Sequence, residues 1–337
     1  MIYYRPIAQT DTARPPLAPW LAGGWCWFDR LERLERGKAA KVVTVDEVPE
    51  SVLQRLCAPR PDIAGLAMDH PRLMGILNVT PDSFSDGGRF HAADAALTHA
   101  RGMAAAGADI LDIGGESTRP GADEVSLADE ISRTEPVIRA LCEAGLTTPI
   151  SIDTRKAEVA KAALQAGARI VNDVAALSFD PELADVVAKA DAPLCLMHAQ
   201  GDPATMQDDP RYDDVLLDVY DYLEGRIAVA EAAGIARERI IVDPGIGFGK
   251  TDGHNLALIR GLSLFHGLGC AILLGASRKR FIGTIGRADA ADDRIPGTLA
   301  VTLAGIAQGV QLHRVHDMAE AKQALRLWQA VTLGETT

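Results

Sequence analysis

Short apolar runs alternate with longer stretches that carry apolar residues at helical spacing along most of the chain after residue 70. Eight such repeats over about 265 residues favour a (β/α)8 TIM barrel, since open doubly wound sheets usually have fewer strands. The strands are predicted at Leu73–Leu77, Ile110–Ile113, Pro149–Ile152, Ile170–Val171, Leu194–Met197, Ile240–Val242, Ala271–Leu274 and Gln311–Val315. The clearest helices are predicted at Ala92–Ala106, Ser126–Ala144, Lys156–Ala166, Asp213–Ala233 and Met318–Val331, and glycines that favour a left-handed C-terminal cap follow four of them, at Gly107, Gly145, Gly167 and Gly234.

Residues 1–70 differ from the rest in composition, because they hold three of the four tryptophans and seven of the eighteen prolines. Nine Lys/Arg balance nine Asp/Glu there, so the net charge of −12 belongs to residues 71–337. Helices are predicted at Phe28–Arg36 and around Val48–Leu56. About 70 residues is near the lower limit for a self-supporting core, so we expect a flap or appended layer on the barrel of residues 71–337. A separate binding function is the less favoured interpretation.

Composition excludes several classes of protein. No run of about 18 apolar residues occurs, so no transmembrane helix is expected. The start of the chain lacks a basic segment followed by an apolar one, so we expect no secretory signal. Five scattered cysteines without a C-x-x-C pair indicate reduced thiols in a cytoplasm and argue against a zinc-thiolate site. The net charge of −12 argues against non-specific binding to nucleic acid or anionic membranes.

Polar residues stand at or just past the end of every predicted strand. In a barrel these ends form one rim, where active sites lie. One such residue means little, because polar residues commonly end strands, but the same feature on eight strands indicates a site. The residues are Asn78, Asp112, Asp153, Asn172, Asp173, His198, Asp243, Ser277, Arg314 and His316.

A glycine-rich stretch at residues 243–251 fits neither common nucleotide motif. A P-loop needs glycine where Pro244 stands, and a dinucleotide fingerprint needs glycine where Lys250 stands. What is left is a turn that lets a ligand or backbone approach closely. Lys279 is either a Schiff-base lysine or part of an anion contact, and its arginine neighbours make the second interpretation at least as plausible.

Two further segments carry candidate chemistry. In MGILNVTPDSFSDGG, residues 74–88, Asn78 offers a neutral oxygen at the rim, and oxygen donors of this kind suit Mg²⁺. Asp82 and Asp86 follow on a long turn, and for Asp86 alone a solvated turn is preferred. In DIGGESTRPG, residues 112–121, Thr118 and Arg119 offer a hydroxyl and a planar cation for phosphate or carboxylate.

With these segments the chain resembles the bacterial dihydropteroate synthases, which make the pterin–aminobenzoate bond in folate biosynthesis. The resemblance spans residues 73 to about 332 and leaves the first 70 residues outside it. The other motifs that carry it follow the family's order: SIDT at 151–154, IVND at 170–173, LMH at 196–198 with QG at 200–201, DPG at 243–245 with GFGK at 247–250, SRK at 277–279 and RVHD at 314–317.

The resemblance implies that Asp243 faces the N–H edge of a pterin ring as a bidentate, charge-assisted partner. A strand-end aspartate taken singly is often a helix cap, and we prefer that interpretation for Asp173 and Asp317. The other ring contacts that the resemblance implies are Asp153, Asn172 and Lys279 at the polar edge, with Met197 and Phe248 as apolar walls.

Arg314 and His316 alternate along the last strand, so both point to the same side, and phosphate sites are frequent after the last strands of barrels. The resemblance implies that these two residues and Thr118 bind the pterin diphosphate. With Mg²⁺ held by Asn78 they would neutralise charge on departing pyrophosphate. A generic anion site without catalysis is the alternative.

For the second substrate, 4-aminobenzoate, the resemblance implies that Ser277 and backbone N–H groups near Arg278 bind the carboxylate. An aromatic amine is already neutral at pH 7, so the predicted path is loss of pyrophosphate to a pterin-stabilised cation, followed by capture by the amine. Asp82 would stabilise that cation or order Mg²⁺. The slot for the ring is expected from Thr80, Pro81, Phe84, Arg119 and Pro120, and the catalytic set is expected to be Asp82, Lys279, Arg314 and His316.

The expected function is therefore that of a cytoplasmic, Mg²⁺-dependent transferase and sulfonamide target, which the family suggests is a homodimer through helices near the C-terminal part of the barrel. A pterin-dependent methyltransferase would share Asp153, Asn172 and Asp243 but would have no use for Arg314 and His316. A catalytically silent pterin-binding paralogue, with an interaction role for residues 1–70, is the alternative from another class.

Overall fold

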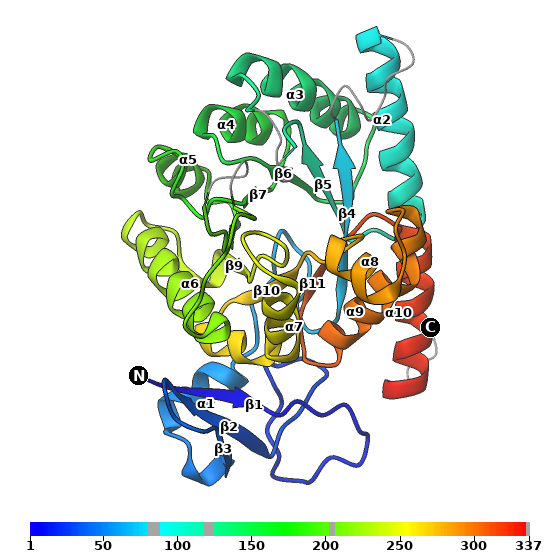
Figure 1. Ribbon diagram of the computed structural model, residues 1–337. Helices are drawn as coiled ribbons and strands as arrows, with labels where there is room; N and C mark the ends of the chain where they lie inside the picture. The colour runs from blue at the N-terminus through cyan, green and yellow to red at the C-terminus, as the bar shows by residue number, and fades with distance from the viewer. Residues whose placement is uncertain (80–87, 118–123, 202–205, 335–337) are drawn as a thin grey trace.

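Eight parallel strands close into a barrel in the computed structural model, which describes residues 1–79, 88–117, 124–201 and 206–334, with side chains from residue 95 on in the second range (Figure 1). The strands follow the chain order around the barrel, and the last strand pairs with the first. Both features confirm the predicted barrel. The strands are β4 (Arg72–Asn78), β5 (Ile110–Gly114), β6 (Ile150–Asp153), β7 (Ile170–Asp173), β8 (Leu194–Met197), β9 (Ile240–Asp243), β10 (Ala271–Leu274) and β11 (Leu312–Val315).

Helices lie outside the strands and cover the barrel (Figure 1). The five clearest predicted helices are present, and the glycines that follow four of them have φ angles of 97°, 76°, 120° and 92°. Within the described ranges, no helix is long and apolar enough to cross a membrane. The helices are α2 (Gly88–Ala105), α3 (Leu127–Glu143), α4 (Ala157–Ala166), α5 (Leu183–Ala190), α6 (Val215–Ala232), α7 (Asp252–Arg260), α8 (Arg280–Gly286), α9 (Ile295–Ile306) and α10 (Met318–Leu333).

Residues 1–70 form a small antiparallel sheet and one helix beside the barrel (Figure 1). The sheet has the order β1 (Ile2–Pro6), β2 (Arg30–Glu35) and β3 (Lys41–Thr44), followed by α1 (Glu50–Cys57). The helix predicted around Val48–Leu56 is confirmed by α1. The helix predicted at Phe28–Arg36 is wrong, because strand β2 pairs along its length with both β1 and β3, and such tertiary pairing overrides local helical spacing.

This N-terminal layer closes one end of the barrel. The side chains of Ile63 and Met68 are each 1% exposed and join the apolar cluster formed by the first residues of the barrel strands. Polar contacts fasten the same layer elsewhere: the Trp25 indole N–H donates to the Ile306 carbonyl at 2.8 Å, and the Arg60 guanidinium donates to the Cys270 carbonyl at 3.1 Å. The cluster shares Met74, Ile110, Ile170, Cys195, Ile241, Ala271, Leu273 and Leu312 with the barrel.

Candidate active site

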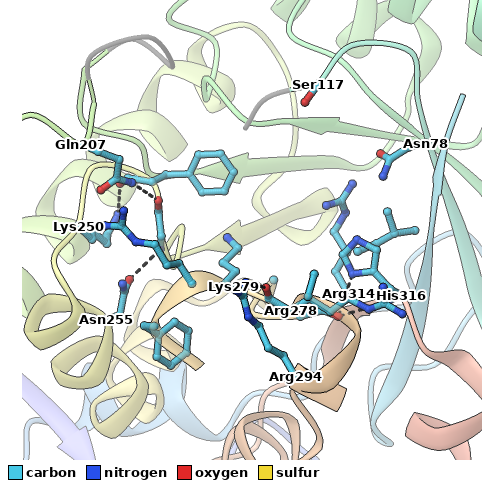
Figure 2. Close-up of a pocket in the computed structure, with 18 of the residues that line it drawn as sticks. Asn78, Ser117, Gln207, Lys250, Asn255, Arg278, Lys279, Arg294, Arg314 and His316 are labelled. Carbon is cyan, nitrogen blue, oxygen red and sulfur yellow. Dashed lines mark hydrogen bonds between the residues drawn. The ribbon is translucent and has the colours of Figure 1, made fainter. Parts of the chain in front are cut away.

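A cavity of about 840 Å³ opens where the barrel strands end, and its size suits a small organic ligand. Figure 2 shows Asn78, Arg314 and His316 on one side of it and Gln207, Lys250 and Asn255 on the other, with Lys279 between them. These residues come from strands and loops that lie far apart in the sequence. The predicted site residues that line the cavity are Asn78, Asp153, Phe248, Ser277, Lys279, Arg314 and His316.

An arginine between two carboxylates organises one wall of the cavity. The Arg314 Nε donates to Asp112 Oδ2 at 2.6 Å, and its Nη2 donates to Asp153 Oδ2 at 2.7 Å. Asn172 Nδ2 also donates to Asp112 Oδ2, at 3.1 Å. Strands β5, β6 and β7, which carry Asp112, Asp153 and Asn172, are neighbours in the barrel. Strand β11, which carries Arg314, is separated from β5 only by β4, so the barrel itself brings the four side chains together.

The two carboxylates of this network keep an unused acceptor each. Asp112 Oδ1 and Asp153 Oδ1 are buried and accept no hydrogen bond from the residues that the structure describes. Burial raises the pKa of Asp153 to about 7, although the nearby Arg314 opposes the shift. A buried acceptor without a partner is unfavourable, so Asp153 beside the cavity is suited to a ligand that brings an N–H donor.

Lys279 and the aromatic ring of Phe248 line another part of the cavity, and the buried Asp243 acts electrostatically on Lys279. Burial raises the pKa of Asp243, and it lowers the pKa of Lys279 to about 7, with Arg314 adding to the second shift and Asp243 opposing it. The Lys279 amine donates a hydrogen bond to the Ile246 carbonyl and lies 4.2 Å from the centroid of the Phe248 ring. Phe248 therefore presents a flat face at the cavity with a cation beside it.

Three of the predicted pterin contacts are almost fully buried. Asn172, Met197 and Asp243 are 4%, 4% and 5% exposed, and none of them is among the residues that line the cavity. Asp243 Oδ1 accepts from the Gly245 N–H at 2.7 Å. These residues stand at or next to the last positions of β7, β8 and β9 and are buried there.

Ser277 and His316, which were predicted for different substrates, contact each other. The Ser277 hydroxyl oxygen lies 2.9 Å from His316 Nδ1 and accepts from the His316 N–H at 3.2 Å. Of the backbone N–H groups near Arg278 that are predicted to bind a carboxylate, the one of Arg278 itself donates to the Thr298 hydroxyl of α9 at 2.9 Å.

The two aspartates predicted as helix caps differ. The Asp173 carboxylate accepts from the backbone N–H groups of Ala175 and Leu177, but a turn and not a helix follows β7, so the helix-cap prediction is wrong for Asp173. Asp317 stands at the N-cap position of α10 as predicted, but its side chain makes no capping hydrogen bond and instead accepts from Arg278 Nε at 3.0 Å. A guanidinium therefore competes for the Asp317 carboxylate.

Asn78, the predicted ligand of Mg²⁺, is the last residue of β4 and lines the cavity. Among the described residues, no group of three His, Cys, Asp or Glu side chains could hold a metal ion. One neutral oxygen at the cavity fits Mg²⁺, which usually takes few protein ligands and completes its shell with water and substrate phosphate. Other predicted residues lie outside the described ranges: Thr80, Pro81, Asp82, Phe84, Asp86, Thr118, Arg119 and Pro120.

Some residues at the cavity carry no earlier prediction. Gln207 and Asn255 both line it and both hydrogen-bond the backbone of Gly247. No motif in the sequence points to either side chain: Gln207 lies 40 residues before Gly247, and Asn255 lies 8 residues after it. Lys250 also lines the cavity, and its only sequence signal is its place in the glycine-rich motif.

Comparisons with known proteins agree with this geometry. Residues 74–316 match the pterin binding enzyme family. The dihydropteroate synthase of Escherichia coli is 45% identical over 265 residues, which are 79% of this chain and 93% of the relative. The dihydropteroate synthase of Xanthomonas albilineans solved with 4-aminobenzoic acid is 47% identical with a TM-score of 0.76, over 81% of this chain and 98% of that one.

The Xanthomonas albilineans enzyme solved in complex with 7,8-dihydropteroate is 44% identical with a TM-score of 0.73, over the same shares of 81% and 98%. These likenesses confirm the resemblance that the motifs carry. The share of this chain that they leave unmatched is about the length of its N-terminal layer. The chain belongs to the dihydropteroate synthases, pterin-binding transferases of folate biosynthesis.

Proposed function

We propose that the chain condenses 6-hydroxymethyl-7,8-dihydropterin diphosphate with 4-aminobenzoate to give 7,8-dihydropteroate and pyrophosphate. The observation that carries the proposal is that one cavity is lined by Asp153, which keeps a buried acceptor without a partner among the described residues, and by the ring of Phe248 with the amine of Lys279 against it. A pterin has a flat ring with N–H donors along one edge and a carbonyl acceptor, which matches this combination of groups.

Asp153 and Asp243 would accept from the N–H edge of the pterin, while Asn172 and Lys279 would donate to its ring oxygen and nitrogen. Phe248 would cover one ring face, and Met197 would support the floor of the site. Excluding water from this buried site strengthens each of these contacts. The carboxylates that are costly to bury in the free protein are thus the groups that a pterin would satisfy.

Arg314 and His316 would bind the diphosphate. The Arg314 guanidinium uses Nε and Nη2 for the two carboxylates, which leaves its Nη1 group for a phosphate oxygen. Asn78 would hold Mg²⁺ together with the phosphates, and Thr118 would add a hydroxyl. The ion would supply positive charge toward the leaving pyrophosphate.

The aromatic amine would enter beside Ser277, whose hydroxyl is oriented by His316. Thr80, Pro81, Phe84, Arg119 and Pro120 would complete its slot, and Asp82 would stabilise the pterin cation or order Mg²⁺. No base is needed to activate a neutral aromatic amine. The chief demand on the protein is therefore stabilisation of charge on pyrophosphate and on the cation.

We further propose a cytoplasmic homodimer that uses α9 and α10. Helix α9 is apolar over most of its length, and α10 leaves Leu327 and Val331 64% and 78% exposed. Exposed apolar residues at successive turns of a helix favour a protein partner. Light scattering on the purified protein should give twice the monomer mass of 35.8 kDa, and Leu327→Asp with Val331→Asp should return it to the monomer.

The reaction is tested by following pyrophosphate release with both organic substrates, with and without Mg²⁺. We expect release to require both substrates and the ion. Asp243→Asn should bind the pterin at least 100-fold more weakly, because it loses a charge-assisted bidentate partner. Pterin binding without release in the wild-type protein would favour the silent paralogue and contradict the proposal.

A further inference from the structure

The loop that presents Phe248 to the cavity is tied down along its backbone by side chains from other parts of the chain. Gln207 Nε2 donates to the Gly247 carbonyl at 2.5 Å, and Asn255 Oδ1 accepts from the Gly247 N–H at 2.7 Å. The Tyr212 hydroxyl donates to the Gly249 carbonyl at 2.8 Å. Figure 2 shows the contacts of Gln207 and Asn255 on the side of the cavity where Lys250 also lies.

Lys250 is the most unusual of these ties. Its side chain is 2% exposed, and its Nζ lies 2.8 Å from His198 Nδ1 and donates to the carbonyls of Phe248 at 3.0 Å and His198 at 3.4 Å. The amine thus has three polar contacts, which join the loop to the segment that follows β8. No carboxylate among the described residues forms an ion pair with this amine, and burial lowers the pKa of Lys250 well below its ordinary value. A buried lysine without a counterion is expensive to keep, which points to a role beyond stability.

The glycines on either side of Phe248 show why this amine can reach both segments. A Cβ on Gly245 would lie 1.8 Å from the His198 carbonyl oxygen, and one on Gly249 would lie 2.5 Å from the Gln200 carbonyl oxygen. Both glycines also have positive φ angles, of 66° and 62°. The loop therefore lies directly on the segment that follows β8, and Lys250 joins the two.

His198 is itself a firm anchor for the amine. The histidine is 5% exposed, and its ring lies edge-on to Tyr222, with 4.8 Å between the ring centroids. The pKa of His198 is lowered to about 2 by burial, with Lys250 adding to the shift, so the ring is neutral and its Nδ1 shares a hydrogen bond with the amine. The position of the Phe248 carbonyl is thus set by a packed, uncharged group.

We propose that Lys250 is a positioning residue for pterin binding: its amine fastens the Phe248 backbone to His198 and so holds the Phe248 ring, with Lys279 against it, at the cavity wall. The inference rests on the proposed function, because it assumes that Phe248 covers a pterin. Lys250 touches no reacting atom. Its effect passes through Phe248, which makes the coupling between the two residues the property to measure.

The test uses the full chain and 6-hydroxymethylpterin as a fluorescent probe in a binding titration. Lys250→Met keeps the length of the side chain and removes its donors, and we expect the Kd to rise about tenfold. The matched control is Lys161→Met on the surface of α4, which should leave the Kd unchanged, since Lys161 is exposed and forms an ion pair with Glu158. Should Lys250→Met fail to fold, Tyr212→Phe removes another tie of the same loop and should weaken binding several-fold.

A double-mutant cycle separates positioning from general damage. Phe248→Ala removes the ring, so adding Lys250→Met to it should change the Kd by less than about twofold if the lysine acts through the ring. An effect of Lys250→Met that is equally large with and without the ring would overturn the inference, as would an unchanged Kd in the single variant. Failure of the wild-type protein to bind the probe would instead refute the proposed function.

Discussion

The two ends of the barrel are built from the same eight strands but serve opposite purposes. At the end where the strands begin, Ile63 and Met68 of the N-terminal layer complete an apolar cluster. At the end where the strands finish, Asp112, Asp153 and Arg314 gather around an open cavity. One end buries apolar surface, and the other buries charge.

This difference teaches where the protein gains stability and where it gives some up. Burial of apolar side chains stabilises a fold at about 25 cal/mol per Å². Burial of charge is unfavourable unless geometry and partners compensate, and the raised pKa of Asp153 and the lowered pKa of Lys279 both record that penalty. We therefore expect changes at the closed end to remove apolar stabilisation, and changes at the open end to alter how well buried charge is compensated.

The largest effect on stability is expected at the closed end. Met68→Asp places a carboxylate where the native side chain is 1% exposed. The free energy of unfolding should therefore fall by about 5 kcal/mol or more. Thermal unfolding followed by circular dichroism measures this. Leu17→Asp in the same layer is the control, because Leu17 is 93% exposed. A melting temperature within about 2 °C of the wild-type value would show that the layer does not close the barrel end.

A smaller loss is expected where the open end depends on one cation. Arg314→Met leaves Asp112 and Asp153 buried without their partner, which should lower the free energy of unfolding by about 3–5 kcal/mol in urea titrations at pH 8. Burial already raises the pKa of Asp153 to about 7, so acidification to pH 6 should protonate that carboxyl. The difference in free energy of unfolding between wild type and Arg314→Met should therefore be smaller at pH 6 than at pH 8. The control is Arg211→Met, which should leave the free energy of unfolding unchanged because the Arg211 side chain is exposed. Equal stability of Arg314→Met and wild type would contradict the idea that this end buries compensated charge.

The smallest effect concerns the pH dependence of Lys279. Its pKa in the folded protein is lowered to about 7 from 10.5, so its contribution to stability is full above pH 10.5 and is lost as the pH falls through 7. Wild-type stability should therefore rise relative to Lys279→Met between pH 7 and 10. The midpoints of urea unfolding at pH 7 and 9.5 test this. The control Lys161→Met should show the same change of midpoint with pH as the wild-type protein. Parallel pH curves for wild type and Lys279→Met would show that the amine is not desolvated.

Local pattern was sufficient for the barrel and insufficient for the layer beside it. Runs such as Leu194–Met197 are buried on both faces, so their composition alone marks them as strands, and helix ends such as Gly167 follow from backbone sterics. Strand β2 was wrongly predicted as a helix, because its pairing with β3 on one edge and with the distant β1 on the other outweighs its local spacing. The packing of Met68 against the barrel strands likewise depends on residues that are distant in sequence.

By itself, the sequence determined the barrel, the rim of polar strand ends and the motifs that identify the family, since each depends on residue type at fixed spacing. The tertiary structure decided which of those polar groups satisfy one another: Arg314 with Asp112, Ser277 with His316, Lys250 with His198. Hydrogen bonds between distant segments depend on distances of a few tenths of an ångström, which only the packed chain sets.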